Sequence, residues 1–381
     1  MSARATGYRS GLDVLLARPP AFLRRARIGL LSHPAGVTAA GQPAAEALCA
    51  AGFQLNALFG PEHGYWGLGG AGERLADEAH PTLGVPIYSL YGARRRPTPE
   101  QLEGLDWLIF DLQDLGVRCY TFLATLRYTL ESAAAAGVGV LVTERPVPQP
   151  GMCDGPCPAP GVENFLAPAD VPLAHGMTPA VAARWLVARY RIPVELRLAR
   201  QRHPPPAGVW PADGPPWIPP SPGIRTWESA VAYASTVWSE AFPQVDVNRT
   251  GPLPFRVVGT SGVRGADLVA ALNAHGLPGV SFHLHRWRGA DGAPREGARL
   301  AVIAPYAFHP VRTGVTMLDT LQQALGTNAL WRAPGARPEF FDRLFGGPSV
   351  RRALQTGRRA EDIARAWTRD LAAFRRRVDE S

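Results

Sequence analysis

The chain has 381 residues, of which 46% are hydrophobic and 19% charged, a composition typical of a globular protein with room for two domains. No apolar run reaches the ~18 to 20 residues of a membrane-spanning helix, and residues 1–10 lack the apolar core of a secretory signal, so we expect a cytoplasmic protein that does not bind membranes. The formal net charge is +8, but the basic residues are all arginine and are spread along the chain, which argues against a nucleic-acid partner.

Short apolar runs alternate with helical patterns over about residues 25–200. A short helix is expected to begin with Thr98 as its N-cap and Pro99 just inside it. Because alternating strands and helices form βα units, the sequence predicts an α/β domain on a parallel sheet. The runs that favour strands cover residues 27–31, 53–59, 85–92, 105–110 and 138–142, and helical spacing covers 43–51, 121–136 and 179–190.

The character of the chain changes after a Pro-rich segment at residues 204–222, which we interpret as a linker. The mixture of elements beyond it indicates a second, smaller α+β domain. We therefore expect one domain at residues 8–225 and another at 226–381. In the second domain, strands are predicted at 255–258, 280–284 and 300–303, and helices at 267–274, 318–325 and 360–378.

Polar side chains gather at the points where the predicted strands end. In open α/β sheets, ligands bind in the crevice beside the carboxyl ends of the strands. The sequence therefore predicts one site at this edge, centred on Glu62 and His63, which follow a buried strand and precede Tyr65 and Trp66. The four clusters are Ser32-His33, Glu62-His63, Asp111 with Gln113 and Asp114, and Glu144-Arg145.

A site with carboxylates, arginines and aromatic rings suits the hydrolysis of glycosides. This reaction needs two carboxyl groups, one protonated near neutral pH and one ionised. Burial at the rim of the sheet would raise the pKa of a glutamate and make it a suitable acid. Aromatic rings would stack on the apolar face of a sugar, and the candidates are Tyr65, Trp66, Tyr88, Tyr91 and Tyr120.

The same residues also have structural interpretations. Glu131 lies some three turns along its predicted helix, so a packing role is favoured over catalysis. The alternatives left open are a hydrogen-bonding pair at Glu62-His63, an internal salt bridge at Glu144-Arg145, and a turn cap or a set of oxygen ligands for Mg²⁺ at Asp111, Gln113 and Asp114.

Other signatures are incomplete in this sequence. The glycine-rich segment 67–72 does not join the first strand to a helix, as a dinucleotide-binding fingerprint requires, so no nucleotide cofactor is expected. Cys153 and Cys157 have no second pair of ligands with zinc-site spacing, and we expect the four cysteines to be free thiols.

Several stretches of the chain resemble the exo-β-N-acetylmuramidase (NamZ-like) family, formerly a domain of unknown function. They occur in the order and spacing of that family and run through most of the chain. The matching stretches are Phe59-Gly60-Pro61-Glu62-His63-Gly64, Ala71-Gly72-Glu73, Ser89-Leu90-Tyr91-Gly92, Arg96-Pro97-Thr98-Pro99, the segment from Phe110 to Thr121, Glu144-Arg145-Pro146, His175-Gly176-Met177-Thr178 and Pro220-Ser221-Pro222.

The resemblance implies a Rossmann-like N-terminal catalytic domain, a smaller C-terminal α+β domain and a cleft between them. It implies release of N-acetylmuramic acid from the non-reducing end of peptidoglycan fragments, with no metal or organic cofactor. Glu62 matches the family's Pro-Glu-His glutamate and is expected to be the general acid, with Glu144, and behind it Asp114 and Asp111, as the second carboxylate. Substrate contacts are expected from His33, His63, Tyr91, Asp111, Gln113, Arg118, Tyr120, Arg145, His175 and Glu240.

The chain also departs from the family pattern around the expected sugar site. Residues 144–148 read Glu-Arg-Pro-Val-Pro where the family has Asp-Arg-Pro-Asn-Pro, and His33 replaces an asparagine. A Gly-Arg-Gly-Thr segment of the family is Asn248-Arg249-Thr250-Gly251 here. Two alternatives to a muramidase therefore remain open: a sugar-binding protein without catalysis, and a metal-assisted hydrolase that uses Asp111, Asp114 and His63.

Overall fold

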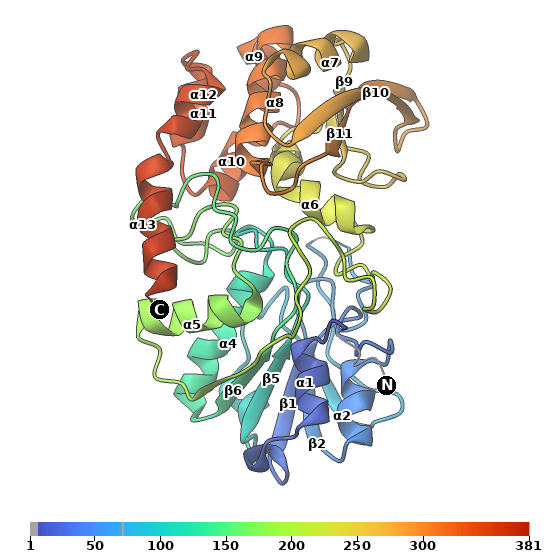
Figure 1. Ribbon diagram of the computed structural model, residues 1–381, viewed down its shortest axis with the longest axis vertical. Helices are drawn as coiled ribbons and strands as arrows, with labels where there is room; N and C mark the ends of the chain where they lie inside the picture. The colour runs from blue at the N-terminus through green and yellow to red at the C-terminus, as the bar shows by residue number, and fades with distance from the viewer. Residues whose placement is uncertain (1–6, 71, 381) are drawn as a thin grey trace, which may run out of the picture.

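The first half of the chain forms a seven-stranded sheet in the order β3-β4-β2-β1-β5-β6-β7 (Figure 1). The structure is a computed structural model that describes residues 7–70 and 72–380. All neighbouring strands pair in parallel except β3, which runs antiparallel to β4. The strands are β1 Arg27–Ser32, β2 Gln54–Gly60, β3 Glu78–Ala79, β4 Pro86–Ser89, β5 Trp107–Asp111, β6 Gly139–Thr143 and β7 Leu196–Ala199.

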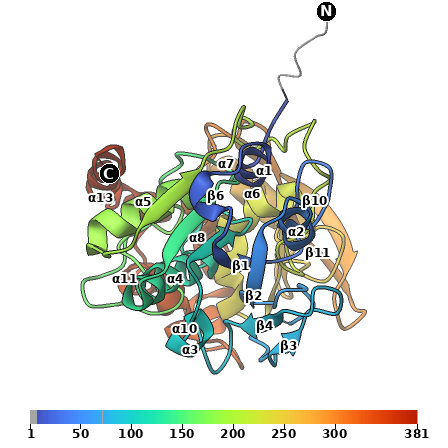
Figure 2. The same cartoon turned by 90° about the horizontal axis from the view of Figure 1, so that it is seen from below.

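Helices cover both faces of this sheet, because strand residues alternate between two apolar clusters. In β5, Leu108 and Phe110 belong to the cluster beneath α3, α4 and α5, whereas Trp107 and Ile109 face α1 and α2. Seen from below, β1 and β2 lie between α2 and α4 (Figure 2). The predicted α/β fold is thus confirmed. These helices are α1 Gly11–Ala17, α2 Ala44–Ala50, α3 Pro99–Leu102, α4 Phe122–Ala136 and α5 Pro179–Tyr190, with a 3₁₀ turn at Ala21–Leu23.

Local signals in the sequence set the helix ends. Thr98 caps α3 through a reciprocal pair of hydrogen bonds with Gln101, as the Thr-Pro start predicts. Helix α4 ends at Gly137, whose φ of 70° is left-handed and favours glycine. The sequence did not reveal β7 because its residues are half-exposed at the sheet edge and form no apolar run.

The second half of the chain forms an antiparallel sheet in the order β10-β11-β9-β8 with helices around it, an α+β arrangement. The prediction of one continuous helix over residues 360–378 is wrong. The structure has two helices there, α12 and α13, which are separated at residues 366–367. The division after residue 225 stays a proposal. The elements are α6 Trp227–Thr236, a 3₁₀ turn Val237–Ala241, β8 Val245–Asp246, β9 Val257–Thr260, α7 Gly265–Ala274, β10 Val280–Arg288, β11 Pro294–Val302, α8 Pro310–Leu325, α9 Thr327–Trp331, α10 Pro338–Phe345, α11 Ser349–Gln355, α12 Ala360–Arg365 and α13 Thr368–Asp379.

The two halves share packed surfaces. Helix α13 returns to lie beside α5 (Figure 1), where the rings of Phe374 and Trp185 are 5.8 Å apart. Arg118, which is fully buried, donates to the carbonyl oxygens of Pro156 and Val171 in the first half and of Leu344 in α10. These contacts fix the position of α10 relative to the first sheet.

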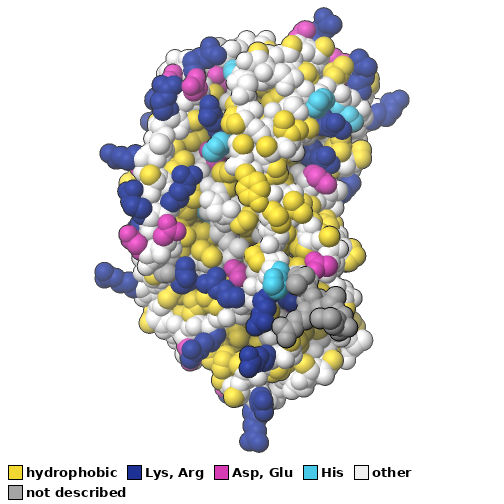
Figure 3. Space-filling view, viewed as in Figure 1, with side chains coloured by type: hydrophobic (Ala, Val, Ile, Leu, Met, Phe, Trp, Pro, Cys, Tyr) yellow, Lys and Arg dark blue, Asp and Glu magenta, His cyan; other side chains and the backbone are white. Residues whose placement is uncertain are grey.

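The surface carries dispersed charge. Arginine side chains are scattered among acidic and apolar ones over the face seen in Figure 3. None of the helices within residues 7–70 and 72–380 is long and apolar enough to cross a membrane. All four cysteines are free thiols, as expected.

Candidate functional site

The loop after β2 brings Glu62 and His63 to the carboxyl edge of the sheet. The last residue of β2 must be glycine, because a Cβ on Gly60 would lie 2.3 Å from the backbone nitrogen of Tyr65. His63 has a left-handed φ of 72°, and its Nδ1 lies 2.9 Å from the carbonyl oxygen of Gly69. This close self-packing sets the direction in which Glu62 points.

The Glu62 carboxyl group is surrounded by neutral hydrogen-bonding groups. The Thr121 hydroxyl lies 2.8 Å from Oε2, and the Gly72 amide lies 3.3 Å from Oε1. The Tyr91 phenol also bonds to Glu62, and burial together with the charge of Glu62 raises the pKa of Tyr91 to about 12. Thr121 and Gly72 donate to the Glu62 carboxyl oxygens, and the hydroxyl groups of Thr121 and Tyr91, unlike the amide, can also accept a hydrogen bond.

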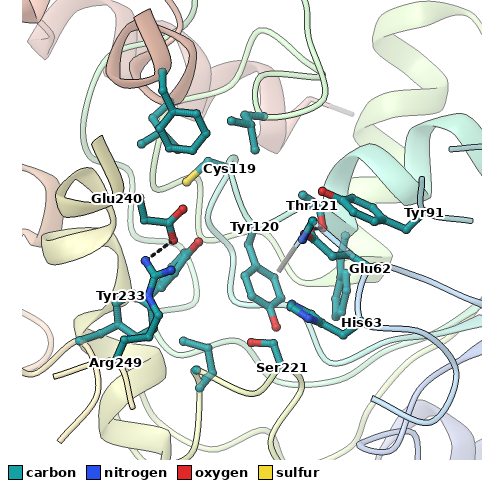
Figure 4. Close-up of a pocket in the computed structure, with 18 of the residues that line it drawn as sticks. Glu62, His63, Tyr91, Cys119, Tyr120, Thr121, Ser221, Tyr233, Glu240 and Arg249 are labelled. Carbon is teal, nitrogen blue, oxygen red and sulfur yellow. Dashed lines mark hydrogen bonds and ion pairs between the residues drawn. The ribbon is translucent and has the colours of Figure 1, made fainter. Parts of the chain in front are cut away.

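Glu62 and Glu240 lie on opposite sides of one cavity of about 400 Å³, with Tyr120 and Tyr233 between them (Figure 4). Its wall comes from the loops after β2, β4, β5 and β6 of the first sheet, from the segment before α6, and from α6, its 3₁₀ extension, the loop after β8 and α10 of the second half. A cavity of this size, polar on two sides and aromatic between, fits one sugar ring.

Glu240 differs from Glu62 because it forms an ion pair with an arginine. Arg249 lies 2.8 Å from its Oε1, an ion pair visible in Figure 4. Burial raises the pKa of Glu240, the guanidinium of Arg249 lowers it, and the negative charge of Glu62 raises it again, so the net shift is upward. The charge on Glu240 therefore depends on Arg249.

Five of the predicted site residues line this cavity: Glu62, His63, Tyr91, Tyr120 and Glu240. The Tyr120 hydroxyl points toward Ser221 (Figure 4), and burial raises the pKa of Tyr120. The expected cleft thus has a counterpart in this cavity, but eight other predicted residues are not on its wall. They are His33, Asp111, Gln113, Asp114, Arg118, Glu144, Arg145 and His175.

Asp111 and Arg145 form a buried ion pair instead of facing the cavity. Both Nε and Nη2 of Arg145 donate to the Asp111 carboxylate, at 2.8 and 2.7 Å. Arg145 also donates to the carbonyl oxygen of Val37, and Asp111 accepts from the Thr143 hydroxyl. This arrangement joins the ends of β1, β5 and β6, and it leaves neither side chain free for a sugar.

Glu144, the expected second carboxylate, points into the protein beside α5 and β7. It accepts from the Thr178 hydroxyl and from the backbone of Gln201 at 3.2 Å, and it pairs with Arg200 at 3.4 Å. Thr178 is the N-cap of α5. The prediction of a catalytic role for Glu144 therefore gains no support from its position.

Three further residues support the loop after β5. The Asp114 carboxylate accepts from the amides of Leu115 and Gly116, and burial without a cation raises its pKa to about 7. Gln113 donates its backbone N–H to His33, and burial lowers the pKa of His33 to about 3, so this imidazole is neutral at pH 7.

His175 also lies apart from the cavity. It is buried, and its Nδ1 accepts from the amide of Met177 at 3.1 Å. Burial lowers its pKa to about 3. Like His33, it serves the local structure as a neutral ring.

The sequence missed much of the wall that the second half supplies. Ser221 and Arg249 lie in segments that were compared with the family pattern. No motif in the sequence indicated that Tyr233 on α6 or Arg337 before α10 would line the cavity. The described residues hold no group of three or more His, Cys, Asp or Glu side chains placed to bind a metal ion, and Asp111 is bonded to Arg145, not to His63.

The family model for the N-terminal part of exo-beta-N-acetylmuramidase NamZ matches residues 28–228, and the model for its C-terminal part matches residues 231–380. The peptidoglycan beta-N-acetylmuramidase NamZ of Bacillus subtilis (strain 168) is 31% identical over 379 residues, which cover 98% of this chain and 90% of that protein.

Two solved structures have the same fold. One DUF1343 family protein from Bacteroides fragilis NCTC 9343 superposes with a TM-score of 0.89 at 25% identity. A second from the same organism gives 0.75 at 22% identity, and in both comparisons 98% of each chain is covered.

Proposed function

The chain belongs to the exo-beta-N-acetylmuramidase NamZ family and is a glycosidase, and from that premise we propose that it releases N-acetylmuramic acid from the non-reducing end of peptidoglycan fragments. The observation that carries this proposal is the placement of Glu62 and Glu240 across one sugar-sized cavity. Two carboxyl groups flanking the scissile bond are the machinery that glycoside hydrolysis requires. No step requires a metal ion.

We assign the proton to Glu62 and the negative charge to Glu240. The partners of Glu62 are hydroxyls and one amide, so it can carry a proton and pass it to the leaving oxygen. Glu240 is paired with Arg249, which cannot accept a hydrogen bond and so favours the carboxylate. An ionised Glu240 would stabilise the positive charge that develops on the sugar, as base or nucleophile.

The direct test uses a disaccharide of N-acetylmuramic acid linked to N-acetylglucosamine. We expect the enzyme to release free N-acetylmuramic acid, detected by mass spectrometry, when this sugar is at the non-reducing end. The control is the disaccharide with the two sugars in reverse order, which should stay intact. Binding of the first disaccharide without any release would contradict the proposal.

The pH dependence tests the assignment of roles. If Glu240 works as a carboxylate, activity is lost as the pH falls through its pKa. Replacing Arg249 with glutamine removes the charge that lowers this pKa, so the acidic limb of kcat/KM should move to higher pH. The alkaline limb, which reports the acid, should stay where it is.

A matched control is Arg256→Gln, since Arg256 pairs with Glu228 and is not on the cavity wall. Its pH profile should equal that of the wild type. Movement of the alkaline limb in Arg249→Gln would instead make Glu240 the acid and overturn the assignment.

A further inference from the structure

The cavity wall carries two arginines, and they differ in their partners. Arg249 is neutralised by Glu240, whose Oε1 lies 2.8 Å away. Arg337 forms no ion pair with any carboxylate in residues 7–70 and 72–380, although its charge lowers the pKa of Glu240. The wall therefore offers one guanidinium whose hydrogen-bonding capacity is largely unused.

Arg337 is held in place without being neutralised. Its backbone N–H donates to the carbonyl oxygen of Ala241 at 2.8 Å, and its Nη2 donates to the carbonyl oxygen of Glu240. Its guanidinium carbon lies 4.6 Å from the centre of the Phe340 ring, which also lines the cavity. One neutral carbonyl and a ring orient the guanidinium but leave its charge available.

The substrate of the proposed function carries one anion that its close analogue lacks. N-acetylmuramic acid is N-acetylglucosamine with a lactyl ether, and the carboxylate of that ether is ionised at neutral pH. A fixed guanidinium binds a carboxylate through paired, charge-assisted hydrogen bonds. The carboxylate of Glu240 would repel the same group, so its place has to be beside a free cation.

We propose that Arg337 binds the lactyl carboxylate and so determines the preference for muramyl over glucosaminyl sugars. This inference rests on the proposed function and names the residue that selects its substrate. Because Arg337 contacts the segment that carries Glu240, it also sets the lactyl group on the Glu240 side of the cavity. The acetamido group and the ring of the sugar would then contact the other walls of the cavity.

The test is the binding of free N-acetylmuramic acid and of its uncharged lactyl amide, measured by isothermal titration calorimetry, which needs no turnover. The wild type should bind the acid about 10- to 100-fold more tightly than the amide, the range expected for hydrogen bonds to a charged group. In Arg337→Gln the acid should lose this advantage while binding of the amide stays within about twofold, a change of under 0.5 kcal/mol.

Arg343→Gln is the matched control. Arg343 also lies over the Phe340 ring, at 5.4 Å, but is not on the cavity wall, so this variant should keep the full preference for the acid. Retention of the preference in Arg337→Gln would overturn the inference while leaving the proposed function intact. A wild type that cleaves the disaccharide but binds acid and amide equally would do the same, whereas a wild type that releases no muramic acid would count against the function itself.

Discussion

Replacing Glu62 with glutamine is expected to lower kcat for the muramyl disaccharide by about 10²- to 10⁴-fold, the usual contribution of a general acid. The amide keeps the shape of the side chain and its contacts with Thr121 and Gly72, but it has no proton to give to the leaving oxygen. A substrate whose leaving group departs without being protonated should not depend on Glu62 as a proton donor. The loss should therefore be much smaller with a dinitrophenyl muramide than with the disaccharide, as measured by initial rates on both substrates.

Two companion variants make this result specific. Glu240→Gln should lose activity on both substrates, since the leaving group does not replace a missing carboxylate. Glu131→Gln should behave as the wild type, because Glu131 pairs with Arg127 and Arg96 on the outside of α4 and is not on the cavity wall. Near-normal turnover of the disaccharide by Glu62→Gln would exclude Glu62 as the acid.

Removing Asp111 should have the largest effect on stability. Asp111→Ala leaves the Arg145 side chain, which is only 4% exposed, without its carboxylate, and breaking a buried pair from one side costs about 3 to 5 kcal/mol of the free energy of unfolding. Urea denaturation followed by circular dichroism measures this loss. The double variant Asp111→Ala with Arg145→Met should recover part of it, because the unpaired charge is then gone.

The control for this effect lies at the other end of the same strand. Asp106 pairs with Arg27 at 3.0 Å, but both side chains are about half exposed, so Asp106→Ala should cost much less than Asp111→Ala. Equal losses from the two variants would show that the pair between Asp111 and Arg145 is not a buried structural link.

The alternating elements of the first half were predictable from the chain. The apolar runs became β1, β2, β4, β5 and β6, because a strand buried on both faces has to be apolar throughout. Helix ends followed from Thr98 and Gly137, whose effects are local. Edge elements such as β7 were missed, since half-exposed residues give no such signal.

The site was predicted only in part, and the reason is geometrical. The polar clusters do lie at the carboxyl ends of neighbouring strands, as the pairing of Ser32 with Asp111 across β1 and β5 shows. Position along a strand does not say whether a side chain opens to solvent or turns inward. Glu62 lines the cavity, whereas Asp111 accepts hydrogen bonds from Arg145 and Glu144 accepts one from Thr178 inside the protein.

By itself the sequence determined the layered α/β half, the α+β half, the family and the loop that presents Glu62. These features depend on residue periodicity and on short, contiguous motifs. Only the tertiary structure decided which carboxylate faces Glu62, because Glu240 lies 178 residues further along the chain and reaches the cavity through the packing of the second half against the first. The ion pairs that neutralise Asp111 and Arg249 and leave Arg337 without a carboxylate partner among the described residues likewise exist only once distant segments meet.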